Sequence, residues 1–354
     1  GGDEFAILIE DVDDSRDVVA PAERVLAAFS APFAIAGSEL FIGASIGLAI
    51  GAPGERTVEE LLRNADFAMY QAKSMGKARH AMFEPRMRDA AVERVEIARL
   101  LRRALDRDEF ILHYQPIVDL RTNVIRGLEA LVRWQQPDRG MLMPDEFIPI
   151  AEETGLIIPL GRWVLREACR QGRIWQARYP GPMPLSIAVN LSPRQFADPR
   201  LVADIREAIL DANLAPASLT LEITESVLIA DGDATLDKLK AIKALGARLA
   251  IDDFGTGYSS LSYLQRFPID ILKIDRAFID AIGKVEGSAL VRSIVDIGRS
   301  LHMQTVAEGV ERPEQPGQLV ELDCELAQGY LMNRPQDAAS IDRVLEDSAR
   351  SLAR

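Results

Sequence analysis

The sequence lacks any uninterrupted run of about 18 or more apolar residues, the length that a membrane-spanning helix requires. It also shows no secretory signal segment. Cysteine is scarce, and Cys169 and Cys324 match no metal-ligand spacing. Two isolated cysteines in apolar surroundings are typical of reduced core residues in a cytosolic protein, so we expect a cytoplasmic location.

An excess of basic residues is missing as well. The chain has 41 Lys and Arg against 54 Asp and Glu, a formal net charge of −13. Because phosphate-rich polymers are bound mainly through basic surface, this balance argues against a long nucleic acid as partner. The objection does not apply to a small anionic ligand held by metal ions. The length of 354 residues is sufficient for two domains.

Two adjacent acids, Asp252 and Asp253, follow an apolar run and precede Gly-Thr-Gly in residues 249–257. Adjacent strand residues point to opposite faces of a sheet. Both acids can therefore reach one cluster only where the strand has ended and the glycine-rich turn redirects the second. This position predicts a divalent-metal site at the C-terminal end of a strand. For an isolated pair, an acidic turn is the alternative, because Asp is a common turn former.

Short apolar runs that end in polar residues recur along the chain and alternate with stretches of helical periodicity, which predicts repeated strand-helix units. The predicted strands are residues 111–118, 124–134, 185–191, 219–225, 248–254, 271–275, 304–310 and 324–330. The stretches 199–211, 234–245 and 287–301 are predicted to be crossover helices. Eight such units fit an α/β fold of the TIM-like (β/α)8 barrel type, whose functional groups come from several strand ends. On periodicity alone, a doubly wound open sheet is the alternative.

The predicted strand ends carry seven motifs in the order typical of one family. They are Glu129-Ala-Leu131 with Arg133, Asn190 in Val-Asn-Leu-Ser, Glu222 in Leu-Glu-Ile-Thr-Glu, Asp252-Asp253-Phe-Gly-Thr-Gly, Lys273 in Leu-Lys-Ile-Asp, Glu308 in Val-Ala-Glu-Gly-Val-Glu, and Gln328-Gly-Tyr. Together they resemble the EAL domain, over about residues 100 to 340. The resemblance implies a bacterial phosphodiesterase that opens cyclic di-GMP to the linear dinucleotide pGpG. A non-catalytic cyclic di-GMP receptor and a two-metal nuclease are the alternatives.

The resemblance also implies a set of metal ligands. They are Glu129, Asn190, Glu222 and Asp252 for one ion, with Asp252 bridging to a second ion that Asp253 and Glu308 complete. Oxygen ligands suit Mg²⁺ or Mn²⁺. Two such ions provide a hydroxide-like nucleophile and neutralise charge on phosphoryl oxygens. Converging acids would repel one another without cations, so we expect two divalent ions in this site.

Further roles follow from the same resemblance. Lys273 is expected to orient the attacking water and stabilise negative charge, as a catalytic residue together with Asp252 and Glu308. Arg133 is expected to grip a substrate phosphate. Gln115 and Leu131 are expected to lie next to the substrate. Asp275 and Gln328 are expected to contact the metal-ligating side chains. Glu225 resembles the acid that braces a loop next to the second metal and the contact of a homodimer.

The alternative for these acids and for Lys273 is a structural role, as helix caps or ordinary ion pairs. No motif assigns a role to His80, His113 or His302, which are expected to be surface or core residues.

The first five residues, Gly-Gly-Asp-Glu-Phe, resemble the signature of GGDEF diguanylate cyclases, and the expected strand at 5–10, the run 40–50 and the stretch 64–73 keep the pattern of that family. Only the C-terminal part of such an α+β domain follows, so we expect a fragment of a tandem cyclase-phosphodiesterase without cyclase activity of its own. The resemblance implies vestigial roles in GTP, metal and phosphate binding for Gly1, Gly2, Asp3, Glu4, Lys73 and Arg79. An intact domain in the full-length protein could bind GTP.

The amphipathic stretch 87–108 is predicted to be a helix that joins two domains. It could be a passive linker or a signal-transmitting helix. We expect a partial GGDEF domain at residues 1–84, a linker helix at 85–108 and an EAL domain at 109–354. A missing N-terminal region could hold a sensor module or a membrane anchor.

Overall fold

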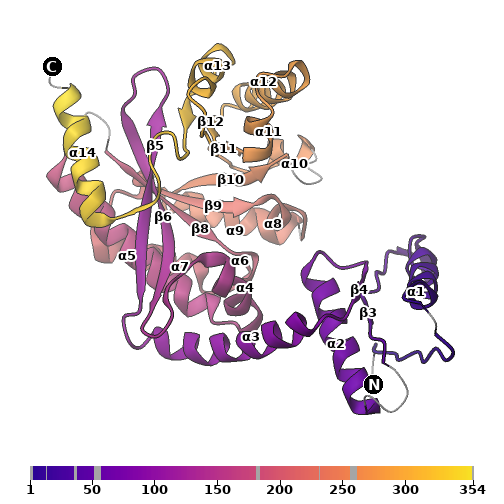
Figure 1. The fold of residues 1–354 in the computed structure, drawn as a ribbon. Helices are drawn as coiled ribbons and strands as arrows, with labels where there is room; N and C mark the ends of the chain where they lie inside the picture. The colour runs from indigo at the N-terminus through magenta and orange to yellow at the C-terminus, as the bar shows by residue number, and fades with distance from the viewer. Residues whose placement is uncertain are drawn as a thin grey trace. The chain divides into compact units, whose positions relative to one another are not determined.

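The structure, a computed structural model, describes residues 3–12, 14–35, 38–51, 57–180, 184–230, 232–255 and 261–352. The chain divides into two compact units, Gly1–Arg99 and Leu100–Arg354 (Figure 1). The division falls within helix α3 (Pro85–Ala104), in the segment where the sequence predicts a linker helix. The domain boundaries at residues 84 and 108 stay predictions.

The second unit is a closed barrel of eight strands surrounded by helices (Figure 1). The barrel strands are β5 (Phe110–Asp119), β6 (Ile125–Gln136), β8 (Ser186–Leu191), β9 (Leu219–Thr224), β10 (Arg248–Phe254), β11 (Ile271–Ile274), β12 (Gln304–Ala307) and β13 (Leu326–Ala327). Pairing runs from β5 through β13, β12, β11, β10, β9 and β8 to β6, and the pairing of β5 with β6 closes the ring. All eight predicted strands are present. The predicted TIM-like barrel is confirmed, and the alternative of a doubly wound open sheet is excluded by the closed ring.

Strand β5 departs from the predicted repeat, because it runs antiparallel to both β6 and β13. A tight turn joins β5 to β6, and parallel neighbours would need a much longer crossover connection. Asp119 shapes this turn by accepting hydrogen bonds from the backbone N–H groups of Arg121 and Thr122. Asn123 adopts a left-handed conformation with φ 56°. The expected repeat of strand-helix units therefore does not hold between β5 and β6, which a turn joins without a helix.

The predicted crossover helices are confirmed as α7 (Leu201–Ala212), α9 (Gly232–Ala244) and α12 (Val285–Ser300). The other elements of this unit are β7 (Gly140–Leu142), α4 (Pro144–Thr154), α5 (Ile157–Arg178), α6 (Pro193–Ala197), η1 (Pro216–Ser218), α8 (Glu225–Ala230), α10 (Leu261–Arg266), α11 (Arg276–Asp280), α13 (Gln315–Glu321), β14 (Gln336–Asp337) and α14 (Ala338–Leu352). Among the helices that the structure describes, none has the length and apolar content that crossing a membrane requires.

A layer of apolar side chains fills the barrel beneath the strand ends. Its members are Ile117, Ala188, Ala250, Ile271, Val306 and Leu326, all buried. Side chains two residues apart on a strand lie on the same face. Each layer member is two positions away from one residue of a polar set, which comprises Gln115, Asn190, Asp252, Lys273, Glu308 and Gln328. Because side chains alternate along each strand, these polar residues lie directly above the buried apolar layer.

The first unit contains α1 (Arg16–Ala28), β1 (Phe33–Ile35), β2 (Ser38–Leu40), β3 (Ile46–Leu48), α2 (Val58–Ser74) and β4 (His80–Met82). The strand expected at residues 5–10 does not form, and Phe5 and Leu8 are largely exposed. A strand needs a neighbour to pair with, and the structure provides none at this segment among the described residues. The run 40–50 is not one continuous strand. It contains the last residue of β2 and the short strand β3.

Helix α3 begins in the first unit, where Arg88 donates a hydrogen bond to the buried Asn64 of α2 at 3.2 Å. The helix expected at 87–108 is confirmed, although its buried face differs in part from the expected one. Leu101 of the predicted apolar face is buried, but Val95 of that face is 72% exposed, and Ile97, which lies outside it, is buried.

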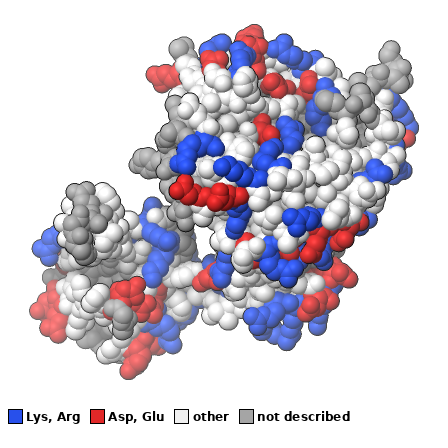
Figure 2. Space-filling model, turned by 180° about the vertical axis from the view of Figure 1, so that it is seen from behind, with Lys and Arg blue, Asp and Glu red and all other residues white. Residues whose placement is uncertain are grey.

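Charged side chains of both signs are interspersed on the face shown in Figure 2. Exposed ion pairs of the second unit include Arg166 with Glu207 at 3.1 Å and Arg276 with Glu311 at 2.8 Å. Exposed pairs of this kind contribute about 0 to 1 kcal/mol each, so they contribute little to the stability of the barrel.

Candidate active site

Four carboxylates converge on the ammonium group of Lys273 inside the barrel mouth. Lys273 Nζ lies 2.6 Å from Glu222 Oε2 and 2.7 Å from Glu308 Oε1. It lies 3.1 Å from Asp252 Oδ1 and 3.8 Å from Glu129 Oε2. These residues come from β6, β9, β10, β11 and the residue after β12, so the strand ends bring together side chains that are far apart in the sequence.

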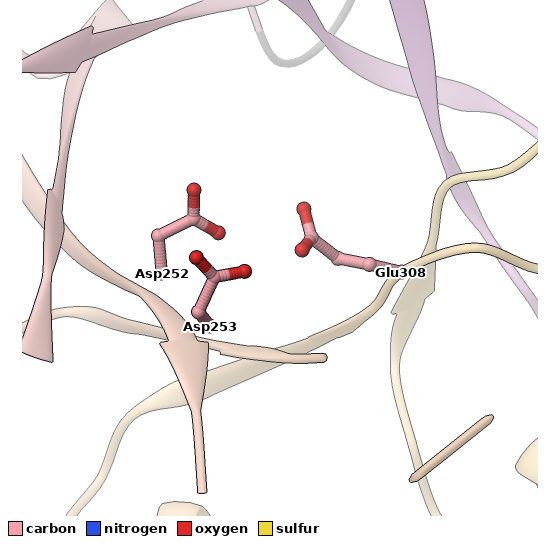
Figure 3. Close-up of side chains that lie close together, drawn as sticks. All are labelled: Asp252, Asp253 and Glu308. Atoms are coloured by element: carbon pink, nitrogen blue, oxygen red, sulfur yellow. The ribbon is translucent and has the colours of Figure 1, made fainter. Parts of the chain in front are cut away.

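Asp252 and Asp253 both face this cluster. Asp253 adopts a left-handed φ of 53°, and the pairing of β10 with β11 becomes irregular between Ile251 and Phe254. This local turn redirects the second acid. Carboxylate oxygens of Asp252, Asp253 and Glu308 lie within 4.8 Å of one another. Figure 3 shows the three side chains turned toward a common space.

The cluster holds more negative charge than Lys273 can balance. Burial raises the pKa of Glu222 well above its usual range and that of Glu308 to about 8, although Lys273 opposes both shifts. Burial and the charge of Asp252 also raise the pKa of Asp253. Burial alone would lower the pKa of Lys273, but the surrounding carboxylates outweigh it and hold that pKa well above its usual range. The arrangement favours additional cations among these acids.

The donor set fits hard divalent ions such as Mg²⁺ or Mn²⁺, because it consists of carboxylate and amide oxygens. Asp252 Oδ1 supports this fit. It is buried and close to Lys273, but no donor of the described residues meets it with hydrogen-bond geometry. Within the described part of the chain, Asp252, Asp253 and Glu308 are the one group of three acids spaced to share an ion.

Side-chain amides hold Glu129 from both sides. Asn190 Nδ2 donates to Glu129 Oε1 at 2.6 Å, and Gln328 Nε2 donates to Glu129 Oε2 at 2.6 Å. Gln328 Nε2 also lies 3.0 Å from Gln115 Oε1, and Gln115 Nε2 donates to the Asn333 carbonyl at 2.9 Å. This network fixes the orientation of the Glu129 carboxylate. Sequence reasoning missed Asn333, because its contribution comes from the backbone and has no side-chain signature.

Arg133 and Leu131 continue the same face of β6 beyond Glu129. Arg133 is 6% exposed, and its Nη1 donates to the neighbouring Val132 carbonyl at 2.8 Å. Burial lowers the pKa of Arg133, and Tyr330 and Glu129 oppose that shift. A guanidinium keeps its charge under these conditions and has five N–H donors. Arg133 therefore places a permanent positive charge on the wall above the acids.

Asp275 serves as a helix cap in this structure. Its Oδ1 accepts a hydrogen bond from the backbone N–H of Ala277 at 2.8 Å, at the start of α11. Asp275 also interacts with Asp253, so it contacts the acid cluster from outside.

Glu225 is the first residue of α8 and is 7% exposed. Neither of its carboxylate oxygens has a hydrogen-bond donor among the described residues.

The described residues of the expected cyclase remnant are exposed on the first unit. Gly1 and Gly2 lie outside the described residues. Asp3 and Glu4 are exposed, as are Lys73 at the end of α2 and Arg79. Arg79 Nε donates to the Lys77 carbonyl at 3.3 Å. Their roles in nucleotide binding stay predictions.

Comparison with known proteins identifies the two parts of the chain. Residues 98–335 match the EAL domain family, and residues 1–79 match the diguanylate cyclase GGDEF domain. The bifunctional diguanylate cyclase/cyclic di-GMP phosphodiesterase MucR of Pseudomonas aeruginosa is 44% identical over 342 residues, covering 96% of this chain and 50% of MucR. The cyclic di-GMP phosphodiesterase PdeR of Escherichia coli is 39% identical over 344 residues, covering 97% of this chain and 51% of PdeR. The chain spans about half the length of these relatives.

Solved structures of EAL proteins resemble the barrel unit. A structure described as the PaMucR phosphodiesterase in complex with c-di-GMP is 46% identical with a TM-score of 0.66, and the match covers 70% of this chain and 99% of that chain. The EAL enzyme Bd1971, in a form bound to cAMP and cyclic di-GMP, is 30% identical with a TM-score of 0.69, and the match covers 82% of this chain and 77% of that chain.

Proposed function

The chain belongs to the EAL domain family, and from this premise we propose that it hydrolyses cyclic di-GMP to linear pGpG with the help of two divalent metal ions. One observation carries the proposal: four carboxylates, three on separate strands and one directly after a fourth strand, meet within 3.8 Å of a buried lysine. The PaMucR structure supports the choice of substrate, since it is described as a c-di-GMP complex and is 46% identical.

In this proposal the ions are held by the oxygen atoms at the barrel mouth. Glu129, Asn190, Glu222 and Asp252 would hold one ion, and Asp252, Asp253 and Glu308 would hold the other. Bound Mg²⁺ or Mn²⁺ supplies a strong nucleophile at neutral pH and neutralises charge on the phosphate. Asn190 and Gln328 keep Glu129 in place through hydrogen bonds of 2.6 Å each.

Lys273 acts on the attacking water and on the phosphate, and Arg133 acts on the substrate. Lys273 Nζ, fixed between Glu222 and Glu308, donates a hydrogen bond to the attacking water and stabilises negative charge that develops on the phosphate. Arg133 holds a phosphate with its planar, permanently charged group. The water oxygen forms a bond to phosphorus, the bond from phosphorus to the ribose 3′ oxygen breaks, and that oxygen takes up a proton. The product carries a 5′ phosphate and a free 3′ hydroxyl group.

The partners of the whole protein follow as further proposals. We propose that the barrel unit forms a homodimer, with Glu225 bracing the neighbouring loop. GTP is the proposed ligand of an intact GGDEF domain, and the proposed location is the cytoplasm. The proposed domains comprise residues 1–84, 85–108 and 109–354.

A chromatographic assay tests the proposed activity. The purified protein is incubated with Mg²⁺ or Mn²⁺ and, separately, with cyclic di-GMP, pGpG and a single-stranded oligonucleotide. We expect cyclic di-GMP to be converted to pGpG and the oligonucleotide to remain intact. Binding of cyclic di-GMP without turnover, in a folded and metal-loaded sample, would favour a receptor function. Cleavage of the oligonucleotide would favour a nuclease.

A further inference from the structure

His113 lies on the face of β5 that points into the barrel mouth. Gln115, two residues later, reaches Gln328 inside the barrel, and Ile117 belongs to the apolar layer beneath it. Tyr114 points the opposite way and packs edge-on against Trp175 of α5, with ring centroids 4.7 Å apart. Since side chains alternate along a strand, His113 shares the inner face with Gln115.

The strand register places His113 one step above the acid cluster. Gln115 is opposite Glu129, and His113 is opposite Leu131. Arg133 is the next residue on this face of β6. A step of two residues along a strand covers about 7 Å, and diagonal neighbours on adjacent strands lie about 7 to 8 Å apart. His113, Leu131 and Arg133 therefore form one continuous wall above Glu129.

The imidazole of His113 is half-buried and in a defined environment. Burial lowers its pKa, and the positive charge of Arg133 lowers it further, while Asp337 and a hydrogen bond to the backbone of Pro335 oppose the shift. A neutral imidazole has one N–H donor and one acceptor nitrogen. Because the Pro335 contact engages the donor, the acceptor nitrogen remains for a ligand.

We propose that His113 is a further substrate-contacting residue, which accepts a hydrogen bond from a donor group of the nucleoside part of the dinucleotide. Phosphate oxygens are acceptors only, so they suit Arg133 rather than an acceptor nitrogen. The N–H groups of a guanine base and the ribose hydroxyl group are donors. Arg133 and His113 thus divide the work on this wall, one holding phosphate and the other the nucleoside.

This inference rests on the proposed function, and a comparison of two substrates tests it. Cyclic di-GMP has nucleoside donor groups, whereas bis(p-nitrophenyl) phosphate is a diester without them. We expect His113→Leu to raise the KM for cyclic di-GMP about fivefold with little change in kcat, and to leave hydrolysis of bis(p-nitrophenyl) phosphate unchanged. His113→Gln restores an acceptor group and is expected to recover part of the affinity.

His302→Asn is a matched control, since His302 is an exposed histidine before β12, at the opposite end of the strands from the acids. His302 has a φ of 57°, which Asn tolerates. An unchanged KM for cyclic di-GMP in His113→Leu would overturn the inference, as would equal losses on both substrates. If the wild-type protein hydrolyses bis(p-nitrophenyl) phosphate but neither binds nor cleaves cyclic di-GMP, the proposed function itself fails.

Discussion

Lys273 Nζ lies 2.6 Å from Glu222 Oε2, and both side chains are almost fully buried, with exposed fractions of 1% and 2%. A buried ion pair is costly to break, because the remaining partner becomes an uncompensated charge. Here the remaining partners would be several acids rather than one. Lys273 therefore serves the fold as well as the chemistry, and the two roles can be separated by experiment.

Lys273→Met is expected to destabilise the metal-free protein and to abolish most turnover. In EDTA we expect the free energy of unfolding to fall by about 3 kcal/mol, since the acids lose their internal cation. Turnover of cyclic di-GMP with Mn²⁺ should fall at least ~100-fold, because the water and the developing charge lose a donor. Denaturant unfolding in EDTA and in Mn²⁺, together with a rate assay, measures both effects.

Lys243→Met is the matched control for this variant. Lys243 lies 2.8 Å from Asp270, and both side chains are 29% exposed. Solvent weakens such a pair, so we expect a loss of about 1 kcal/mol or less and normal turnover. Mn²⁺ should restore more stability to Lys273→Met than it adds to wild type, because metal ions can replace the missing charge. Equal stability of wild type and Lys273→Met in EDTA would contradict the structural role.

Asp252→Asn is expected to separate function from stability. The change removes a proposed bridging ligand, so turnover should fall at least ~100-fold. It also removes one negative charge from a cluster in which burial, and then the charge of neighbouring acids, raise the pKa of Glu222 and Asp253. We therefore expect the unfolding free energy in EDTA to stay the same or rise by about 1 kcal/mol. Asp233→Asn, at a side chain that is 91% exposed, should change neither quantity. Wild-type turnover in Asp252→Asn would refute the assigned ligand.

The barrel could be predicted from the sequence because buried strands and crossover helices have different periods. The orientation of β5 could not, since direction depends on the short turn after Asp119 and the period of two is the same for either direction. The first unit was predicted less well. The apolar run that includes Phe5 has strand composition, but a strand forms only with a partner, which local sequence does not specify.

The acids of the site could be located in the sequence because each one lies within or directly after a predicted strand, and the carboxyl ends of parallel strands meet at one rim. The contacts between them could not be located. Gln328 reaches Glu129 across 199 positions of sequence, and Gln115 reaches the carbonyl of Asn333 across 218. His113 carries no motif, and only its strand register places it beside Leu131.

The two cysteines provide a test of core packing that is independent of the active site. Burial raises the pKa of Cys169 to about 12 and that of Cys324 to about 11. Because the thiolate is the reactive form, neither thiol should react with Ellman's reagent at pH 8 in the native protein. In guanidinium chloride, which unfolds the protein, both cysteines should react. Rapid labelling of the native protein would show that one of these regions opens readily.

Gly329→Ala is expected to disturb the strand end that carries Gln328. A Cβ atom at this position would lie 2.1 Å from the Val310 carbonyl oxygen and 2.3 Å from its nitrogen, and backbone atoms cannot move aside easily. The segment must shift, so Gln328 should lose its hydrogen bond to Glu129. We expect a loss of about 2 kcal/mol in unfolding free energy together with reduced turnover.

Gly317→Ala is the matched control. Gly317 lies inside α13, and a Cβ atom there meets nothing within 4 Å. Alanine in a helix interior should stabilise the protein by about 0.5 to 1 kcal/mol. Denaturant midpoints that move in the same direction for both variants would contradict the close approach of Gly329 to Val310.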